Sequence, residues 1–193
     1  MIVMIFFAGK NNRKRGPAAL SQPFWRRAAQ NLFPDRIYPG GIYDVNLKEL
    51  YDGGVAGIIA DMDNTLIEPG ARQPGARMAE WIDAARDIGF DICLLSNSSR
   101  RRVVRISSGF GIYAVSSACK PAGAGFYKAM RLLGLGPSQV CVIGDQIFTD
   151  IYGAKRLGIM AIYTGPITKK EEPTIRLKRI PEKFILNHCS TVP

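Results

Sequence analysis

The sequence predicts an α/β protein built on a doubly wound parallel sheet, and three observations lead to this fold class. The chain has 193 residues, the length of one ordinary domain, and 47% of them are hydrophobic. From residue 55 onwards, short apolar runs alternate with stretches of helical periodicity. The connections between them are short, as expected for a parallel sheet whose helices cross over between successive strands.

The first predicted strand covers residues 55–60, a continuous apolar run of the kind that is buried on both faces of a sheet. Met78 and Trp81 then belong to an apolar stripe at helical spacing, and Gly89 offers an end for that helix. A second apolar run, residues 90–95, predicts the next strand.

The remaining elements continue the same alternation. They are a helix over 99–108, a strand over 112–115, a helix that opens at Pro121, a strand over 140–143, a helix from a Thr149 cap to Leu157, and a strand over 160–163.

The segments on either side of this region carry most of the positive charge. The formal net charge is +10, of which residues 1–54 and 164–193 contribute +4 and +3. We expect a basic N-terminal arm over 1–54, a core over 55–163 and a basic C-terminal tail over 164–193 with at most a short helix. Residues 21–33 of the arm predict an amphipathic helix that packs on or beside the core. Basic arms favour anionic partners such as lipid headgroups, nucleic acid or phosphorylated substrates, and a solvated surface is the plain alternative.

The four cysteines show no metal-binding spacing, and Cys93 and Cys141 fall inside predicted strands. This pattern predicts reduced, buried thiols in a cytoplasmic protein. Residues 1–8 are apolar, but the run is too short to span a bilayer, and the positive charges follow it rather than precede it as in a secretory signal. We therefore expect no exported or membrane-spanning protein.

Polar side chains follow the predicted strands at one edge of the sheet, where open parallel sheets bind their ligands. Asp61 and Asp63 follow the first strand, Ser96 the second, Lys120 the third, and Asp145 with Asp150 the fourth. Carboxylates suit Mg²⁺, and a lysine suits phosphoryl oxygens. The sequence therefore predicts a site for a divalent cation and a phosphate.

The spacing of these residues suggests how they share the chemistry. Asp61 and Asp63 lie two residues apart, so both side chains are expected to point the same way. One can serve as nucleophile and metal ligand, and the other as general acid and base. Ser96 can donate its hydroxyl to the phosphoryl group. The arginines at 100–102 and 105 fan around the second helix, so only one or two of them can face the site.

The series D-M-D-N-T, S-N, K-P and V-I-G-D-Q-I-F-T-D resembles, in this order, the four motifs of the haloacid dehalogenase superfamily, over residues 55–163. The details D-x-D-N-T-L-I, L-S-N, A-C-K-P and G-D-Q-x-x-T-D resemble its class IIIA, YqeG-like branch, which is related to the mitochondrial phosphatidylglycerophosphate phosphatases. Ser98 departs from that branch, where a second Asn is frequent at this position.

The resemblance implies a role for each of these residues. Asp61 would form an aspartyl-phosphate, and Asp63 would protonate the leaving alcohol, then activate water, while its backbone carbonyl binds Mg²⁺. Ser96 would hold the phosphoryl group, Lys120 would stabilise its charge, Asp145 would ligate Mg²⁺, and Asp150 would be a further ligand or support one.

The spacing of the elements leaves no room for a cap domain. Only about eight residues separate Thr65 from the helix near Pro74, and the segment between Ser96 and Lys120 is filled by a helix and a strand. An open site suits a bulky substrate, such as a lipid headgroup at a membrane.

The sequence therefore favours a Mg²⁺-dependent phosphomonoesterase, with phosphatidylglycerophosphate as the candidate substrate by resemblance and a place in phospholipid biosynthesis. We expect a cytoplasmic enzyme that contacts the anionic inner membrane surface peripherally through its basic arms. Two alternatives stay open: a phosphatase for soluble sugar or nucleotide phosphates, and a basic nucleic-acid- or ribosome-binding protein with a secondary phosphatase site.

Overall fold

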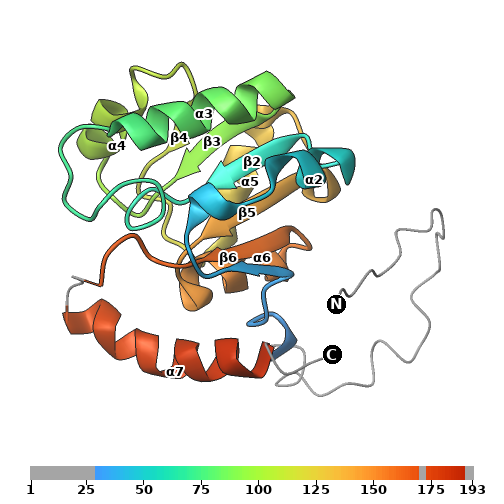
Figure 1. Ribbon diagram of the computed structural model, residues 1–193, viewed down its shortest axis with the longest axis vertical. Coiled ribbons are helices and arrows are strands. Elements are labelled where there is room, and N and C mark those ends of the chain that lie inside the picture. The colour runs from blue at the N-terminus through green and yellow to red at the C-terminus, as the bar shows by residue number, and fades with distance from the viewer. Residues whose placement is uncertain (1–28, 170–172, 190–193) are drawn as a thin grey trace.

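A six-stranded parallel sheet runs through the middle of the protein (Figure 1). The computed structural model describes residues 29–169 and 173–189. The strands stand in the order β1-β6-β5-β2-β3-β4, and every neighbouring pair is parallel. Their bounds are β1 Arg36–Tyr38, β2 Gly57–Ala60, β3 Asp91–Leu95, β4 Tyr113–Val115, β5 Val140–Gly144 and β6 Met160–Thr164. The predicted parallel α/β sheet is confirmed, because β2 to β6 lie where the five strands were predicted.

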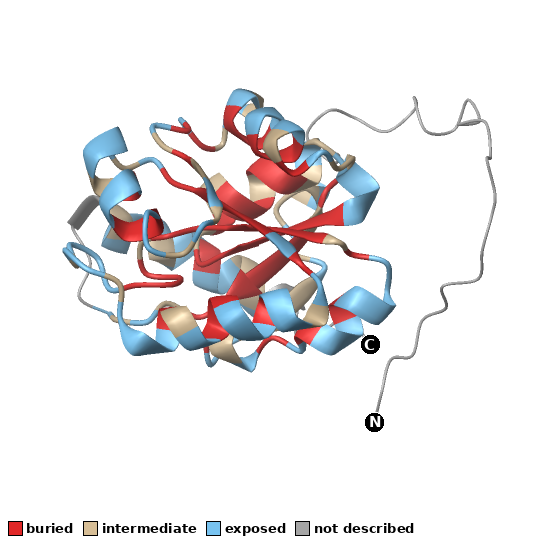
Figure 2. Ribbon diagram, turned by 90° about the horizontal axis from the view of Figure 1, so that it is seen from above, coloured by how far each residue is buried: buried red, intermediate tan, exposed pale blue. Residues whose placement is uncertain are grey.

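Helices cover both faces of this sheet (Figure 1). Their bounds are α2 Leu47–Asp52, α3 Ala76–Ile88, α4 Arg100–Ser107, α5 Gly123–Leu133, α6 Tyr152–Arg156 and α7 Pro173–Cys189. One apolar core joins α2, α3 and α4 to one face, and a second joins α5, α6 and α7 to the other. Successive residues of β2 serve the two cores, since Ile58 belongs to the first and Ile59 to the second. Figure 2 shows buried residues along the strands and exposed residues on the outer sides of the helices.

The sheet extends further than the sequence predicts, because β1 forms a sixth strand beside β6. The prediction missed β1 because its three residues, Arg-Ile-Tyr, are only half-buried and contain no apolar run. In α2, which also lies in the segment assigned to the N-terminal arm, Leu47 and Leu50 are buried in the first core. The later part of residues 1–54 thus packs with the sheet. The helix predicted over 21–33 lies mostly outside the described residues.

The helix after β5 begins earlier than predicted. A π-helical turn, η4 (Ile147–Ile151), leads directly into α6, and Gln146 rather than Thr149 stands at the N-cap position. The carboxylate of Asp150 is buried in this wide turn and accepts a hydrogen bond from the Gln146 amide at 3.3 Å. The turn therefore places the Asp150 side chain inside the protein, behind the end of β5.

α7 is a helix of 17 residues, where the sequence predicted at most a short one. Pro181 lies in its interior, and a proline there removes a backbone hydrogen bond and usually breaks a helix. Contacts with the domain offset this cost. Ile185 and Leu186 pack against the second core, and Glu182 accepts a hydrogen bond from the Ile147 amide at 2.8 Å.

No cap domain is inserted among the described residues. The loop over 61–75 joins β2 to α3, and α4 lies between β3 and β4. Across the described ranges, no helix combines the length and the hydropathy needed to cross a lipid bilayer.

Candidate active site

The carboxyl ends of the central strands meet at one edge of the sheet, and a cleft of about 590 Å³ opens there. Its lining includes Asp61 and Asp63 after β2, Ser96 after β3, and Lys120 after β4. Asp145 follows β5 directly. The structure therefore brings the sequence-predicted side chains of four strands to one place.

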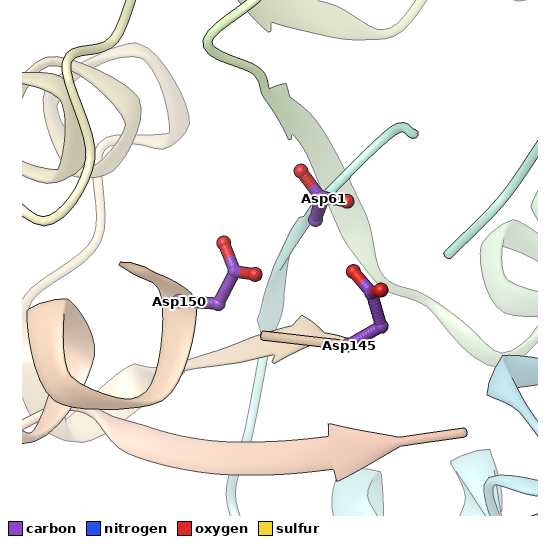
Figure 3. Close-up of side chains that lie close together, drawn as sticks. All are labelled: Asp61, Asp145 and Asp150. Atoms are coloured by element: carbon purple, nitrogen blue, oxygen red, sulfur yellow. The ribbon is translucent and has the colours of Figure 1, made fainter. Parts of the chain in front are cut away.

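Three buried carboxylates, those of Asp61, Asp145 and Asp150, lie close together at this edge (Figure 3). One oxygen of each lies within 4.8 Å of the other two, and at most 6% of any of these residues is exposed. Among the described residues, Oδ2 of Asp61 is buried without a hydrogen-bond partner. Such an oxygen needs a partner, and carboxylate oxygens are the ligands that Mg²⁺ prefers. These three residues therefore fit the divalent cation that the sequence predicts.

Lys120 supplies a positive charge to two of these carboxylates. Its Nζ lies 2.5 Å from Oδ1 of Asp61 and 2.6 Å from Oδ1 of Asp150, and the residue is only 7% exposed. The side chain of Asn97 holds the lysine's backbone, because Asn97 Oδ1 accepts from the Lys120 amide at 2.7 Å and Nδ2 donates to its carbonyl at 3.3 Å. Burial alone would lower the pKa of Lys120, but the Asp150 and Asp61 carboxylates outweigh it and hold the pKa above its ordinary value.

Burial, together with the neighbouring carboxylates, makes two of the carboxylates hard to ionise. Burial raises the pKa of Asp61 to about 6, although Lys120 acts in the opposite direction. Burial and the neighbouring Asp61 raise the pKa of Asp145 to about 8, against the influence of Arg179. A cation bound between these carboxylates would favour their ionised forms and so would lower both pKa values.

Asp63 has different partners from the three clustered carboxylates. Its carboxylate forms an ion pair with Arg102 and accepts a hydrogen bond from the Ser98 hydroxyl at 2.8 Å. Both Arg102 and Ser98 line the cleft. Asp63 and Asp61 therefore share the cleft, as the sequence predicts, but the Asp63 carboxylate lies outside the cluster that could hold a metal. Arg102 is the one arginine of its run in this cleft, which agrees with the expectation that only one or two face it.

Ser96 shapes the loop that follows β3. Ser96 is only 1% exposed, and its Oγ accepts a hydrogen bond from the Ser98 amide at 3.0 Å. Ser96 is among the residues that line the cleft, and its role toward a phosphoryl oxygen stays a prediction.

α7 brings two further residues to the site that the sequence analysis missed. Arg179 forms an ion pair with the carboxylate of Asp145 and also donates to its backbone carbonyl. Glu182 accepts from Arg179 at 3.0 Å and, with its other oxygen, caps the Ile147 amide. Glu182 is the one acidic residue within 173–189, three positions after an arginine. The spacing of Arg179 and Glu182, one helical turn apart, was the available signal for a helix, and the prolines at 173 and 181 argued against one.

The loop after β2 is also hydrogen-bonded to the segment that follows β6. Asn64 donates through Nδ2 to the Thr168 carbonyl at 3.0 Å and accepts from the Thr168 amide at 2.9 Å. Thr65 donates to Oδ1 of Asp145 at 3.2 Å. Asn64 has a φ of 66°, a left-handed conformation that Asn tolerates better than most residues. These bonds fix the loop that carries Asp61 and Asp63.

Comparisons of the sequence with known proteins point to one family. A family model for haloacid dehalogenase-like hydrolases matches residues 73–158. The chain is similar to the probable phosphatase YqeG of Bacillus subtilis (strain 168), with 34% identity over 156 residues that cover 81% of this chain and 90% of that protein. It is 26% identical over 172 residues to a phosphatidylglycerophosphate phosphatase 1, chloroplastic, of Chlamydomonas reinhardtii, covering 83% of this chain and 64% of that protein.

A solved structure shares the fold. An uncharacterized protein from Listeria monocytogenes serotype 4b aligns with a TM-score of 0.50 and 22% identity, over 62% of this chain and 85% of that one. At this identity the likeness concerns the arrangement of the sheet and its helices.

Proposed function

The chain belongs to the haloacid dehalogenase-like hydrolases, and from this membership we propose that it is a Mg²⁺-dependent phosphomonoesterase with Asp61 as its nucleophile. The observation that carries the proposal is the buried group of three carboxylates with Lys120 paired to two of them. Such a group has charges that an in-line phosphoryl transfer requires, a carboxylate to attack and a fixed positive charge, that of Lys120, to stabilise the phosphoryl oxygens.

In the first half of the reaction, the Asp61 carboxylate attacks the phosphorus of the ester. The bond from phosphorus to the alcohol oxygen breaks, and protonated Asp63 gives that oxygen its proton, so that an alcohol leaves and Asp61 becomes an aspartyl-phosphate. Ser98 and Arg102 hold the Asp63 carboxyl group for this transfer. Lys120 balances the charge of Asp61 and of the transferred phosphoryl oxygens.

In the second half, the Asp63 carboxylate accepts a proton from a water molecule whose oxygen attacks the phosphorus. The bond from phosphorus to Asp61 breaks, which releases inorganic phosphate and restores both carboxyl groups to their starting states. Asp61, Asp145 and Asp150 would hold the Mg²⁺ ion, with the backbone carbonyl of Asp63 as the further ligand that the resemblance implies. When bound, Mg²⁺ neutralises charge on the phosphoryl oxygens.

The proposal is tested by the hydrolysis of p-nitrophenyl phosphate with and without Mg²⁺. We expect Mg²⁺-dependent turnover that falls at least about a thousandfold in Asp61→Asn, because the amide cannot act as the nucleophile. Asp87→Asn, an exposed carboxylate on α3, is the matched control and should keep the wild-type rate. A wild-type protein that hydrolyses no phosphate ester with Mg²⁺ would refute the proposed activity.

Phosphatidylglycerophosphate is the proposed physiological substrate. The similarity to a phosphatidylglycerophosphate phosphatase supports this choice, and so does the cleft without a cap, which leaves space for a large headgroup. A panel of phosphate esters tests the choice, with phosphatidylglycerophosphate in mixed micelles beside sugar and nucleotide phosphates. If a soluble phosphate has a clearly higher kcat/KM than phosphatidylglycerophosphate, that soluble compound becomes the proposed substrate instead of the lipid.

We also propose that the protein works at the cytoplasmic face of an anionic membrane. α7 supports this, because Leu177 and Ile180 are 70% and 68% exposed on the outer side of the helix, next to exposed Arg176 and Lys183. An apolar and basic helix face is typical of interfacial binding. Co-sedimentation with vesicles that contain anionic lipid is expected to fall in Leu177→Ser with Ile180→Ser, and unchanged binding would contradict this role for α7.

A further inference from the structure

A second groove, of about 540 Å³, lies beside the catalytic cleft. Four arginines contribute to its lining, Arg72, Arg101, Arg102 and Arg105, and no acidic residue does. Gly70 and Arg102 line both the groove and the cleft, so the two openings adjoin at these residues. A molecule in the cleft that extends past Arg102 would therefore reach the groove.

The groove brings together arginines from two segments of the chain. Arg101 and Arg105 are one helical turn apart on α4, and Arg72 comes from the loop between β2 and α3. All three are exposed, and within the described ranges none of them forms an ion pair. Arg102 is the paired member, through its contact with Asp63. The groove thus presents positive charge without a paired carboxylate next to Arg102 and Asp63 of the catalytic cleft.

This arrangement is unfavourable for the free protein. Like charges at positions i and i+4 of a helix repel each other. The arginines at 100–102 also occupy the first turn of α4, where the helix dipole favours negative charge instead. A bound anion would remove both costs. The planar fork of an arginine side chain matches the oxygens of a phosphate group, which it binds through two hydrogen bonds.

We propose that this arginine groove, lined by Arg72, Arg101 and Arg105, binds a second phosphate group of the same molecule whose phosphate ester is hydrolysed at Asp61. The inference rests on the proposed function for its reaction, and it adds the substrate class: phosphomonoesters that carry a further phosphate or phosphodiester. A phospholipid with a phosphorylated headgroup offers this chemistry, and so does a soluble bisphosphate.

The test compares substrates with one and two phosphate groups. The probes are a short-chain phosphatidylglycerophosphate, fructose 1,6-bisphosphate and, as the one-phosphate reference, p-nitrophenyl phosphate. We expect the ratio of kcat/KM for a two-phosphate probe to that for p-nitrophenyl phosphate to fall about tenfold in Arg101→Gln and further in Arg101→Gln with Arg105→Gln, since each loses a charged hydrogen bond. Arg131→Gln, an exposed arginine near the end of α5, is the matched control that should keep this ratio.

The two probes separate the sources of the second phosphate. A fall for the phospholipid probe alone assigns the groove to a lipid diester, and a fall for both probes assigns it to phosphate in general. Ratios that stay at the wild-type value in the double variant for both probes would overturn the proposal.

A binding measurement keeps this proposal separate from the proposed activity. Calorimetry on Asp61→Asn with the same two-phosphate probes reports binding without turnover. Affinity that falls in the Arg101→Gln, Arg105→Gln background supports the groove even if the wild-type protein proves inactive. Affinity that is independent of both arginines refutes the groove even if the phosphatase activity is confirmed.

Discussion

Lys120 carries a positive charge that is buried between two carboxylates of the site, within 2.6 Å of both Asp61 and Asp150. Removal of one partner of a buried ion pair costs about 3–5 kcal/mol, because the remaining charge is left without compensation. We expect Lys120→Met to lower the free energy of unfolding by about 3 kcal/mol in the absence of divalent cations and to abolish phosphatase activity. Urea denaturation in the presence of a chelator measures the first effect.

The control for this prediction is Lys128→Met, which removes an exposed lysine from α5. Its unfolding midpoint should stay close to the wild-type value. A Lys120→Met protein with the wild-type midpoint would show that the ion pairs of Lys120 contribute nothing to folding.

At the residue scale, the positions of the site residues were predictable and their partners were not. Because Asp61, Lys120 and Asp145 each follow an apolar strand, a parallel sheet must place them at one edge. The pairing of Asp63 with Arg102 depends on where the loop after β2 passes the first turn of α4, which no local pattern encodes. The chemical roles of these residues stay predictions until the variants are assayed.

At the element scale, α7 shows what local patterns cannot reveal. Its sequence contains Pro181 and four basic residues, which are typical of a tail. Its fold depends on contacts with residues more than thirty positions away, among them Asp145 and Ile147. β1 was missed for a related reason, because a three-residue edge strand is specified by its pairing with β6 rather than by its own hydrophobicity.

The contact of α7 with Asp145 predicts competition with a divalent cation. The guanidinium of Arg179 pairs with Oδ2 of Asp145, an oxygen of the carboxylate cluster. We expect Arg179→Gln to lower the Mg²⁺ concentration for half-maximal activity about tenfold, equivalent to about 1.4 kcal/mol, since the cation then replaces a weaker partner. A Mg²⁺ titration of the rise in thermal midpoint provides a measurement without turnover.

Arg176→Gln is the matched control for this prediction, because Arg176 lies on the exposed side of the same helix. Its Mg²⁺ requirement for a soluble substrate should equal that of the wild type. A higher Mg²⁺ requirement in Arg179→Gln would mean that Arg179 supports the cation site rather than competes for it.

At the scale of the whole molecule, positive charge surrounds a buried acidic centre. The net charge of +10 is predictable from composition, and so is its concentration in the flanking segments. The structure further shows that positive side chains from separate segments line the cleft. Arg102 comes from the core and Lys178 from the tail. Positive groups around a cleft favour anionic ligands, while Asp61, Asp145 and Asp150 form the acidic cluster within it that could hold a cation.

The metal-free protein should lose stability as the pH rises. The pKa of Asp145 is raised from 3.8 to about 8, and that of Asp61 from 3.8 to about 6, chiefly by burial. Between pH 3.8, the ordinary pKa of an aspartate, and about pH 8, the folded protein holds more protons than the unfolded chain. The free energy of unfolding therefore falls as the pH rises through this range. We expect the thermal midpoint in a chelator to drop by about 5 °C from pH 6 to pH 8. Saturating Mg²⁺ should remove most of this drop, because the cation stabilises the ionised carboxylates.

Asp145→Asn isolates the contribution of Asp145 to this pH dependence. The variant lacks the carboxyl group with the higher pKa, so its midpoint in the chelator should change less between pH 6 and pH 8 than that of the wild type. Mg²⁺ should also raise its midpoint less, since one of the three clustered carboxylates is gone. A metal-free wild-type midpoint that rises from pH 6 to pH 8 would contradict the electrostatic account, because the buried carboxyl groups would then be ionised in the folded protein as readily as in the unfolded chain.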